Sequence, residues 1–188
     1  EETFRSSQTG LVYYNNGELI STLKGVKDVY YIDYKDIPSQ IINAIIVTED
    51  KKFFGHEGID YLANVRAAIA LIKHKGDITQ GASTITQQLA RNMFLTHEVT
   101  YERKIKEIFI AQELEKIYSK DKIIEFYLNN IYYSNGYYGL QAAANGYFGR
   151  GINQLSLSEM IFLCAIPNNP SRYDPIENKE NTLARRDR

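Results

Sequence analysis

The pattern of hydrophobic and polar positions changes once along the chain, close to residue 36. Before that point, short apolar runs at 11–14 and 18–21 flank Asn15-Asn16-Gly17, and a turn signal between two extended runs predicts a β-hairpin. After Pro38, apolar residues recur every three or four positions, which is the period of an α-helix. The sequence therefore predicts a mainly α fold with a short β element at its N-terminus.

Helix start signals divide the helical part into segments. Thr84 with Gln87, and Ser156 with Glu159, have the spacing of a capping box, in which each side chain accepts a hydrogen bond from the other residue's backbone N–H. The expected helices cover 38–50, Asp60 to about 76, Thr84 toward Leu95, a long stretch from Thr100, a stretch from Ser119, a stretch after Ser156, and 178–188.

Two further expectations concern packing and connections. The stretch after Thr100 is expected to be an amphipathic helix with Ile105, Ile108, Phe109 and Ile117 on its apolar side. Residues 167–175 begin and end with proline, so we expect a stiff extended connection there.

Composition narrows the class of protein. Of the 188 residues, 44% are hydrophobic and 24% charged, as in an ordinary globular domain, and the length suits one domain or one domain with a small lobe. The formal net charge of −1 gives no basic field for collecting phosphates, so we expect no nucleic-acid partner. Cys164 lies in an apolar run and is expected to be buried rather than reactive. No apolar stretch reaches the roughly 18 residues of a membrane span.

The first candidate for chemistry is the acidic pair Glu49-Asp50 at the end of an expected helix. Acidic side chains at a helix C-terminus oppose the helix dipole, and this pair leads into a glycine-containing loop with Phe53 and His56. A solvated surface pair is the alternative interpretation. Because the acidic pair is unfavourably placed and lies beside an aromatic loop, we favour a functional role for it.

Two more candidates lie further along the chain. The polar segment 81–88 enters a helix, where backbone N–H groups bind anions or sugar hydroxyls, although plain N-capping explains it equally well. Arg103, Lys104 and Glu107 have helical i,i+3 and i,i+4 spacing, which on its own favours ordinary surface ion pairs.

Two other signals carry little weight. Ser119-x-x-Lys122 matches a string found in penicillin-reactive serine enzymes, but its partner motifs are absent from the sequence, and Ser119 is better explained as a helix cap. His56 and His74 have no Cys or further His at metal-ligand spacing, so we expect no zinc site and name no metal-ligating residue.

Taken together, these segments resemble the peptidoglycan glycosyltransferases of glycosyltransferase family 51, which are the transglycosylase domains of class A penicillin-binding proteins and their monofunctional relatives. The resemblance covers roughly residues 10–175, with arginine at 91 and 150 where lysine is common. The motifs that carry it are Glu49-Asp50-x-x-Phe53-x-x-His56-x-Gly58, Gly81-x-x-Thr84-x-Thr86-Gln87-Gln88, Arg103-Lys104-x-x-Glu107, Lys120-x-x-Ile123-Ile124-Glu125-x-Tyr127-Leu128-Asn129 and Ala143-Ala144-x-x-Tyr147-Phe148-Gly149-Arg150.

The resemblance implies a lysozyme-like, two-lobed helical domain. It places an N-terminal hairpin segment at 1–35, the glycosyltransferase domain at 36–177 with a small membrane-facing lobe around 58–100, and the start of a linker at 178–188. Family members polymerise lipid II into β-1,4-linked glycan strands of the bacterial cell wall, with inversion and release of undecaprenyl pyrophosphate. The chain is therefore expected to be a transferase that contributes to cell shape.

The resemblance also implies residue roles. Glu49 is expected to be the base that takes the proton of the acceptor hydroxyl, and Glu107 to help place the pyrophosphate, its metal or the basic side chains. Charge growing on the pyrophosphate needs cations, here Arg91, Arg103 and Lys104 with a divalent cation, Mg²⁺ or Mn²⁺, bound with the donor pyrophosphate. The other substrate-binding residues implied are Asp50, Phe53, His56, Ser83, Thr84, Gln87 and Gln88.

Expected partners follow from the same resemblance: lipid II, the growing glycan strand, the membrane surface and moenomycin-type inhibitors. We expect the domain at the extracytoplasmic face of the cytoplasmic membrane, held by an N-terminal transmembrane helix outside this chain. A bifunctional parent with a transpeptidase domain after residue 188 is favoured over a monofunctional enzyme. The apolar segments 67–72 and 93–95 are candidate membrane contacts, with burial in the core as the alternative.

Two other functions remain open from the sequence. A lysozyme-like hydrolase or lytic transglycosylase also uses a catalytic glutamate, but its sugar leaving group needs a proton donor and no pyrophosphate site, so the basic cluster disfavours it. A non-catalytic glycan- or membrane-docking module is disfavoured because Glu49 and Glu107 are retained.

Overall fold

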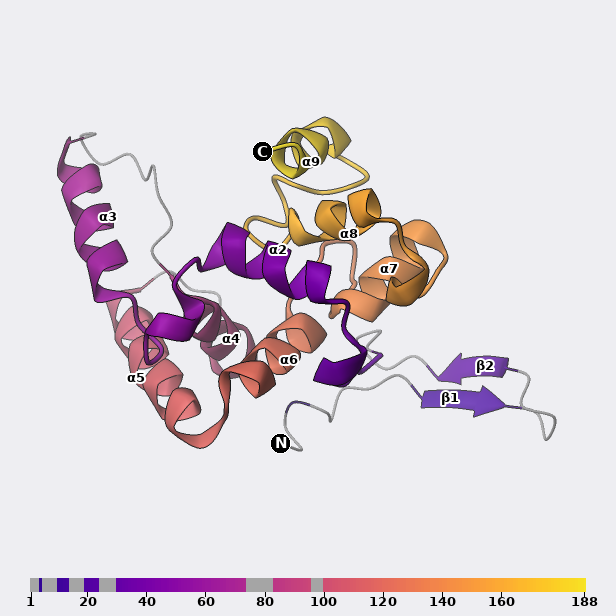
Figure 1. Cartoon of the computed structure of the whole chain (residues 1–188), viewed down its shortest axis with the longest axis horizontal. Helices are drawn as coiled ribbons and strands as arrows, with labels where there is room; N and C mark the ends of the chain where they lie inside the picture. The colour runs from indigo at the N-terminus through magenta and orange to yellow at the C-terminus, as the bar shows by residue number, and fades with distance from the viewer. Residues whose placement is uncertain (1–3, 5–9, 14–18, 24–29, 74–82, 96–99) are drawn as a thin grey trace. The chain divides into compact units, whose positions relative to one another are not determined.

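The computed structural model describes residues 4, 10–13, 19–23, 30–73, 83–95 and 100–188 (Figure 1). The chain forms two compact units, one of residues 46–124 and one that joins residues 1–45 to 125–188. Each unit is described separately below. The domain boundaries and the membrane-facing lobe expected from the sequence stay predictions.

The described residues are mostly helical, with one short hairpin of strands β1 (Gly10–Tyr13) and β2 (Leu19–Leu23), so the predicted mainly α fold with an N-terminal β element is confirmed. The Asn15-Asn16-Gly17 turn lies outside the described residues. Short 3₁₀ turns are η1 (Tyr34–Asp36), η2 (Phe53–Gly55) and η3 (Ile152–Gln154). The α-helices are α2 (Ser39–Glu49), α3 (Tyr61–Lys73), α4 (Ile85–Phe94), α5 (Tyr101–Ile117), α6 (Lys120–Asn130), α7 (Leu140–Phe148), α8 (Leu157–Cys164) and α9 (Lys179–Arg186).

The unit of residues 46–124 is built around the packing of α4 against α5, which lie side by side in Figure 1. The expected capping box starts α4: Thr84 accepts from the backbone N–H of Gln87, and the Gln87 side chain accepts from that of Thr84. Gly58 has a positive φ of 87°, and a Cβ there would lie 2.9 Å from the backbone of Ala111, so only glycine lets the loop approach α5 this closely.

The second unit holds the hairpin and helices α7 to α9. Its strands pair antiparallel, with Gly10 opposite Leu23. Residues before α2 are fastened to α6, because Tyr31 donates to Glu125 and Asn129 exchanges hydrogen bonds with the backbone of Ile32. Cys164 is 1% exposed, which confirms that it is a buried residue.

One helix was not expected, and two expectations about the fold are wrong. Helix α7 is not anticipated by the sequence pattern, because alanines form its buried side and glycines stand at its start and within it. Residues 167–175 form successive turns rather than an extended connection, with Tyr173 N–H donating to the Asn169 carbonyl. The apolar side expected for α5 is largely exposed: Ile105 is 55%, Phe109 64% and Ile117 68% accessible.

No helix in the part of the chain that the structure describes is long and apolar enough to cross a bilayer.

Candidate active site

The residues that the sequence marks as the site all fall in the unit of residues 46–124. They come from the end of α2, the loop through η2, the start of α4 and the first turns of α5. In chain order they are Glu49, Asp50, Phe53, His56, Ser83, Thr84, Gln87, Gln88, Arg91, Arg103, Lys104 and Glu107. Gly81 of the second motif lies outside the described residues.

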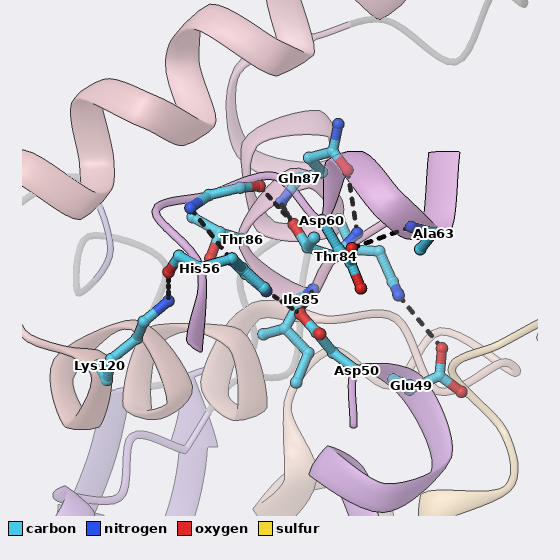
Figure 2. Close-up of polar contacts among 12 residues, drawn as sticks. Glu49, Asp50, His56, Asp60, Ala63, Thr84, Ile85, Thr86, Gln87 and Lys120 are labelled. Carbon is cyan, nitrogen blue, oxygen red and sulfur yellow. Dashed lines mark hydrogen bonds and ion pairs between the residues drawn. The ribbon is translucent and has the colours of Figure 1, made fainter. Parts of the chain in front are cut away.

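Glu49 is the last residue of α2 and faces α4. The Gln88 side-chain amide donates to Glu49 Oε2 at 3.1 Å, and Figure 2 shows Glu49 at the end of this contact. Glu49 is partly exposed, whereas Gln88 is buried. A partly exposed carboxylate that accepts a hydrogen bond from a buried amide suits a group that meets substrate.

The neighbouring acid, Asp50, is buried and contacts groups of the protein itself. It is 7% exposed, and its Oδ2 accepts from the backbone N–H of Ile85 at 3.0 Å and lies 2.9 Å from His56 Nε2. The Gly58 N–H donates to His56 Nδ1 at 3.1 Å. Since a backbone N–H only donates, Nδ1 is the acceptor and the ring proton sits on Nε2, where it bonds Asp50. Asp50 and His56 thus hold each other in place next to Glu49.

The start of α4 is also held by contacts within the protein. Besides the capping box, the Thr84 hydroxyl donates to the Gly58 carbonyl at 2.6 Å, and the first helical N–H, that of Ile85, is taken by Asp50. Plain N-capping, the alternative weighed for this segment, therefore accounts for these groups. The Gln87 Nε2 atom is buried and has no hydrogen-bond partner within the described residues.

The basic cluster is more than a surface ion pair. Glu107 is 0% exposed, and its two carboxylate oxygens meet Lys104 Nζ and, at 3.4 Å, Arg103 Nη1. Lys104 also donates to Ser83 Oγ at 2.9 Å, which links α5 to the residue before α4's cap. Two cations share one buried carboxylate, so the cluster keeps one unit of positive charge, and the Lys104 side chain is 36% exposed.

Arg91 lies one turn beyond Gln88 on α4 and is partly buried. Its guanidinium makes no hydrogen bond or ion pair within residues 30–73, 83–95 and 100–188, the long described stretches. Phe53, the first residue of η2, is 0% exposed, so its side chain is part of the core under this loop.

The structure adds three polar residues that sequence reasoning did not place in the site. Lys120, Glu115 and Thr86 form a chain of contacts beside His56. Lys120 and Thr86 stand in the motifs quoted above, and Thr86 also lies in the polar segment 81–88. Glu115 gave no sequence signal.

A pocket of about 460 Å³ opens beside the same loop. Of the candidate site residues only His56 lines it, together with Lys52, Glu57, Asp60 and Gln112 among others.

The described residues do not form a site for a protein-held metal. No group of three or more His, Cys, Asp or Glu side chains in the described stretches is placed to hold one. The nearby acids are engaged: Glu107 by two cations and Asp50 by His56 and a backbone N–H.

This arrangement defines a class of protein: a mainly helical domain that holds a partly exposed carboxylate and a cationic cluster in fixed positions. Comparison with known proteins identifies the family, because the family model described as Transglycosylase matches residues 16–188. The chain belongs to this family and is a glycosyltransferase enzyme, which confirms the resemblance predicted from its motifs.

Similar sequences among known proteins include several penicillin-binding proteins. Penicillin-binding protein 1A of Aquifex aeolicus is 46% identical over 185 residues, covering 98% of this chain and 25% of that protein. Penicillin-binding protein 4 of Bacillus subtilis is 41% identical over 182 residues, covering 96% and 29%. Penicillin-binding protein 1A of Escherichia coli is 44% identical over 176 residues, covering 93% and 20%. The chain thus spans between a fifth and a third of the length of these relatives.

A solved structure, that of Penicillin-Binding Protein 1A from Haemophilus influenzae, matches 96% of this chain and 17% of that chain with a TM-score of 0.48 and 22% identity.

Proposed function

We propose that this domain polymerises lipid II into β-1,4-linked peptidoglycan strands, with inversion at the muramic acid C1 and release of undecaprenyl pyrophosphate. The names of the relatives, which are penicillin-binding proteins, support a role in cell-wall synthesis. They also support a parent protein with a transpeptidase domain beyond this chain.

The observation that carries the proposal is the cluster on α5. A fully buried Glu107 holds Arg103 and Lys104 in place, and Lys104 is one-third exposed. Fixed cations are what a departing pyrophosphate requires, because negative charge accumulates on it as the sugar bond breaks. A hydrolase of the lysozyme type has no use for such a cluster, since its leaving group is an uncharged sugar.

In the proposed reaction Glu49 accepts the proton of the incoming 4-hydroxyl while that oxygen attacks C1 from the face opposite the pyrophosphate. Gln88 orients the Glu49 carboxylate through its 3.1 Å hydrogen bond. Arg103 and Lys104 bind the pyrophosphate oxygens, and Glu107 positions both cations. Arg91, on the turn of α4 after Gln88, is the third cation proposed to reach the phosphates.

A divalent cation, Mg²⁺ or Mn²⁺, is proposed to arrive with the substrate pyrophosphate. It would neutralise phosphate charge that three basic side chains balance only in part. Moenomycin-type phosphoglycolipids are expected to compete for the same cations.

We also propose that the domain works at the extracytoplasmic face of the membrane, where its lipid-linked substrate resides. Large apolar side chains exposed in the unit of residues 46–124 are candidates for the contact with the membrane. Within the candidate segments 67–72 and 93–95, Ile69 is 49% and Phe94 44% exposed. Further large apolar side chains exposed in this unit are Tyr61, Leu62, Val65, Ile105 and Phe109.

The test is polymerisation of lipid II in detergent with Mg²⁺ or Mn²⁺, read as glycan chains on a gel. Glu49→Gln keeps the shape but removes the base, so we expect the rate to fall about 10³-fold. Glu57→Gln, an exposed acid in the same loop, is the matched control and should keep full activity.

Other outcomes would replace the proposal. A wild-type chain that shortens preformed glycan without making polymer would be a hydrolase. One that binds lipid II but neither builds nor cuts glycan would be a docking module.

A further inference from the structure

Lys120, the first residue of α6, contacts three groups that lie apart in the sequence. Its ammonium donates to the His56 carbonyl at 2.6 Å and to Glu115 Oε1 at 2.7 Å. The same ammonium lies 4.4 Å from the centroid of the Phe53 ring, within the range of a cation–π contact. Figure 2 shows the Lys120 side chain directed at the backbone of His56.

These contacts are shielded from water. The Lys120 side chain is 20% exposed, the Glu115 side chain 6% and Phe53 0%. Glu115 Oε1 also accepts from the Thr86 hydroxyl of α4 at 2.6 Å. A buried carboxylate left with one neutral donor would be strongly unfavourable, so the charge of Lys120 is needed where it stands.

His56 is therefore held at two points. Lys120 fixes its backbone carbonyl, while Asp50 and the Gly58 N–H fix the two nitrogens of its ring. Asp50 Oδ2, which the ring meets, also accepts from the Ile85 N–H at the start of α4. Asp50 directly follows Glu49, the last residue of α2, so the contacts that hold His56 also hold the residue next to Glu49.

We propose that Lys120 is a positioning residue for Glu49, acting through His56 and Asp50. The proposal rests on the proposed function, in which Glu49 is the base. Lys120 reaches neither Glu49 nor the α5 cation cluster in the contacts described above, so its removal should misplace the base without removing a substrate contact. A small misplacement of a reacting group costs rate rather than affinity.

The decisive variants are Lys120→Met and Lys120→Arg. Methionine keeps an unbranched apolar stem on Phe53 but has no donor, so we expect kcat per folded molecule to fall 10- to 100-fold with KM within 2-fold. Arginine donates to both acceptors and stacks on the ring, so it should stay within about 3-fold of wild-type kcat. Lys116→Met is the matched control, because Lys116 pairs with Glu113 at the surface, where both side chains are more than 60% exposed; its kcat should not change.

A second readout does not depend on activity. Long-range ¹H–¹⁵N spectra report which nitrogen of the His56 ring carries the proton. Wild type and Lys120→Arg should show the Nε2–H tautomer, and Lys120→Met a mixture of both. Glu115→Gln, which keeps an acceptor for Thr86 but removes the charge facing Lys120, should shift the tautomers less and lower kcat about 5-fold. It serves in place of Lys120→Met if that variant does not fold.

The outcomes separate the two proposals. An active wild type with Lys120→Met at wild-type kcat overturns the positioning role, and so does a fall in kcat with an unchanged His56 spectrum. A wild type that makes no polymer overturns the proposed function instead; the His56 spectra then still decide whether Lys120 holds this loop.

Discussion

Both compact units bury a carboxylate, but they satisfy it in different ways. In the unit of residues 46–124, Glu107 is 0% exposed and meets two cationic side chains, Arg103 and Lys104. In the other unit, Asp174 is 8% exposed and accepts from the Ser134 hydroxyl at 2.6 Å, from a side-chain amide and from two backbone N–H groups, all of which are neutral.

The difference indicates what each acid is for. Neutral donors complete the hydrogen bonds of Asp174 and tie a turn of the chain to its neighbours without bringing a cation to the site, so its contribution is to stability. The two cations on Glu107 exceed its charge, and Lys104 remains 36% exposed. A buried acid that holds surplus cations near solvent prepares a binding site for an anion.

Of the changes that test this difference, loss of the Glu107 charge is expected to have the largest effect. Glu107→Gln replaces two acceptor oxygens by one acceptor and one donor, and the new N–H group faces a cation. Arg103 and Lys104 should lose their fixed positions, and we expect kcat/KM for lipid II polymerisation to fall about 10²-fold, an effect of about 3 kcal/mol.

Its control is Glu113→Gln, in which an exposed acid of the same helix loses its pair with Lys116. Exposed pairs of this kind contribute about 0–1 kcal/mol, so activity should be unchanged. Equal losses in the two variants would mean that α5 responds to charge in general and that Glu107 has no special role.

Much of this site was predictable from the sequence because its signals are local. The capping box of Thr84 and Gln87 and the helical spacing of Arg103, Lys104 and Glu107 depend on neighbouring residues only. What the sequence did not reveal is that Glu107 faces inward. Hydrophobic periodicity marked Ile105 and Phe109 as the apolar side of α5, yet these are exposed and the buried side carries the glutamate with Ala111 and Leu114.

Other parts depend on contacts between distant segments. The link from Lys120 to the His56 carbonyl joins residues 64 positions apart, and no periodic pattern encodes a backbone acceptor. Helix α7 was missed because alanine gives a weak hydrophobic signal and Gly139, with φ of 85°, reads as a loop residue rather than a helix start. Its Gly146 is required for packing, since a Cβ there would lie 2.1 Å from the Tyr137 ring.

The second prediction tests the stabilising role of Asp174 by pH. Burial by itself would raise the pKa of Asp174, but hydrogen bonds, led by those from Ser134 and Asn135, outweigh it and lower the pKa from 3.8 to about 2. Because the folded pKa is the lower one, this contribution is present above pH 4 and is lost as pH falls from about 4 to 2. The shift corresponds to about 2 kcal/mol of unfolding free energy.

Chemical denaturation between pH 6 and 2 checks this. Asp174→Asn should be less stable than wild type at pH 6 and should lose less stability than wild type as pH falls from 4 to 2, with polymerisation activity per folded molecule unchanged. Asp36→Asn, at an exposed acid of the same unit, should follow the wild-type curve. A large loss of activity per folded molecule in Asp174→Asn would contradict the conclusion that Asp174 contributes to stability alone.

The smallest effect compares two capping boxes, one from each unit. Ser156 caps α8 through Glu159, and Thr84 caps α4 through Gln87. Loss of a capping hydroxyl costs about 1 kcal/mol of stability, so Ser156→Ala and Thr84→Ala should each lower the free energy of unfolding by about that amount. Only the Thr84 hydroxyl also donates to the Gly58 carbonyl of the loop beside the candidate base. Thr84→Ala should therefore also lower kcat several-fold, while Ser156→Ala keeps wild-type kcat. Equal kcat values in the two variants would show that Thr84 only caps its helix and has no role in catalysis.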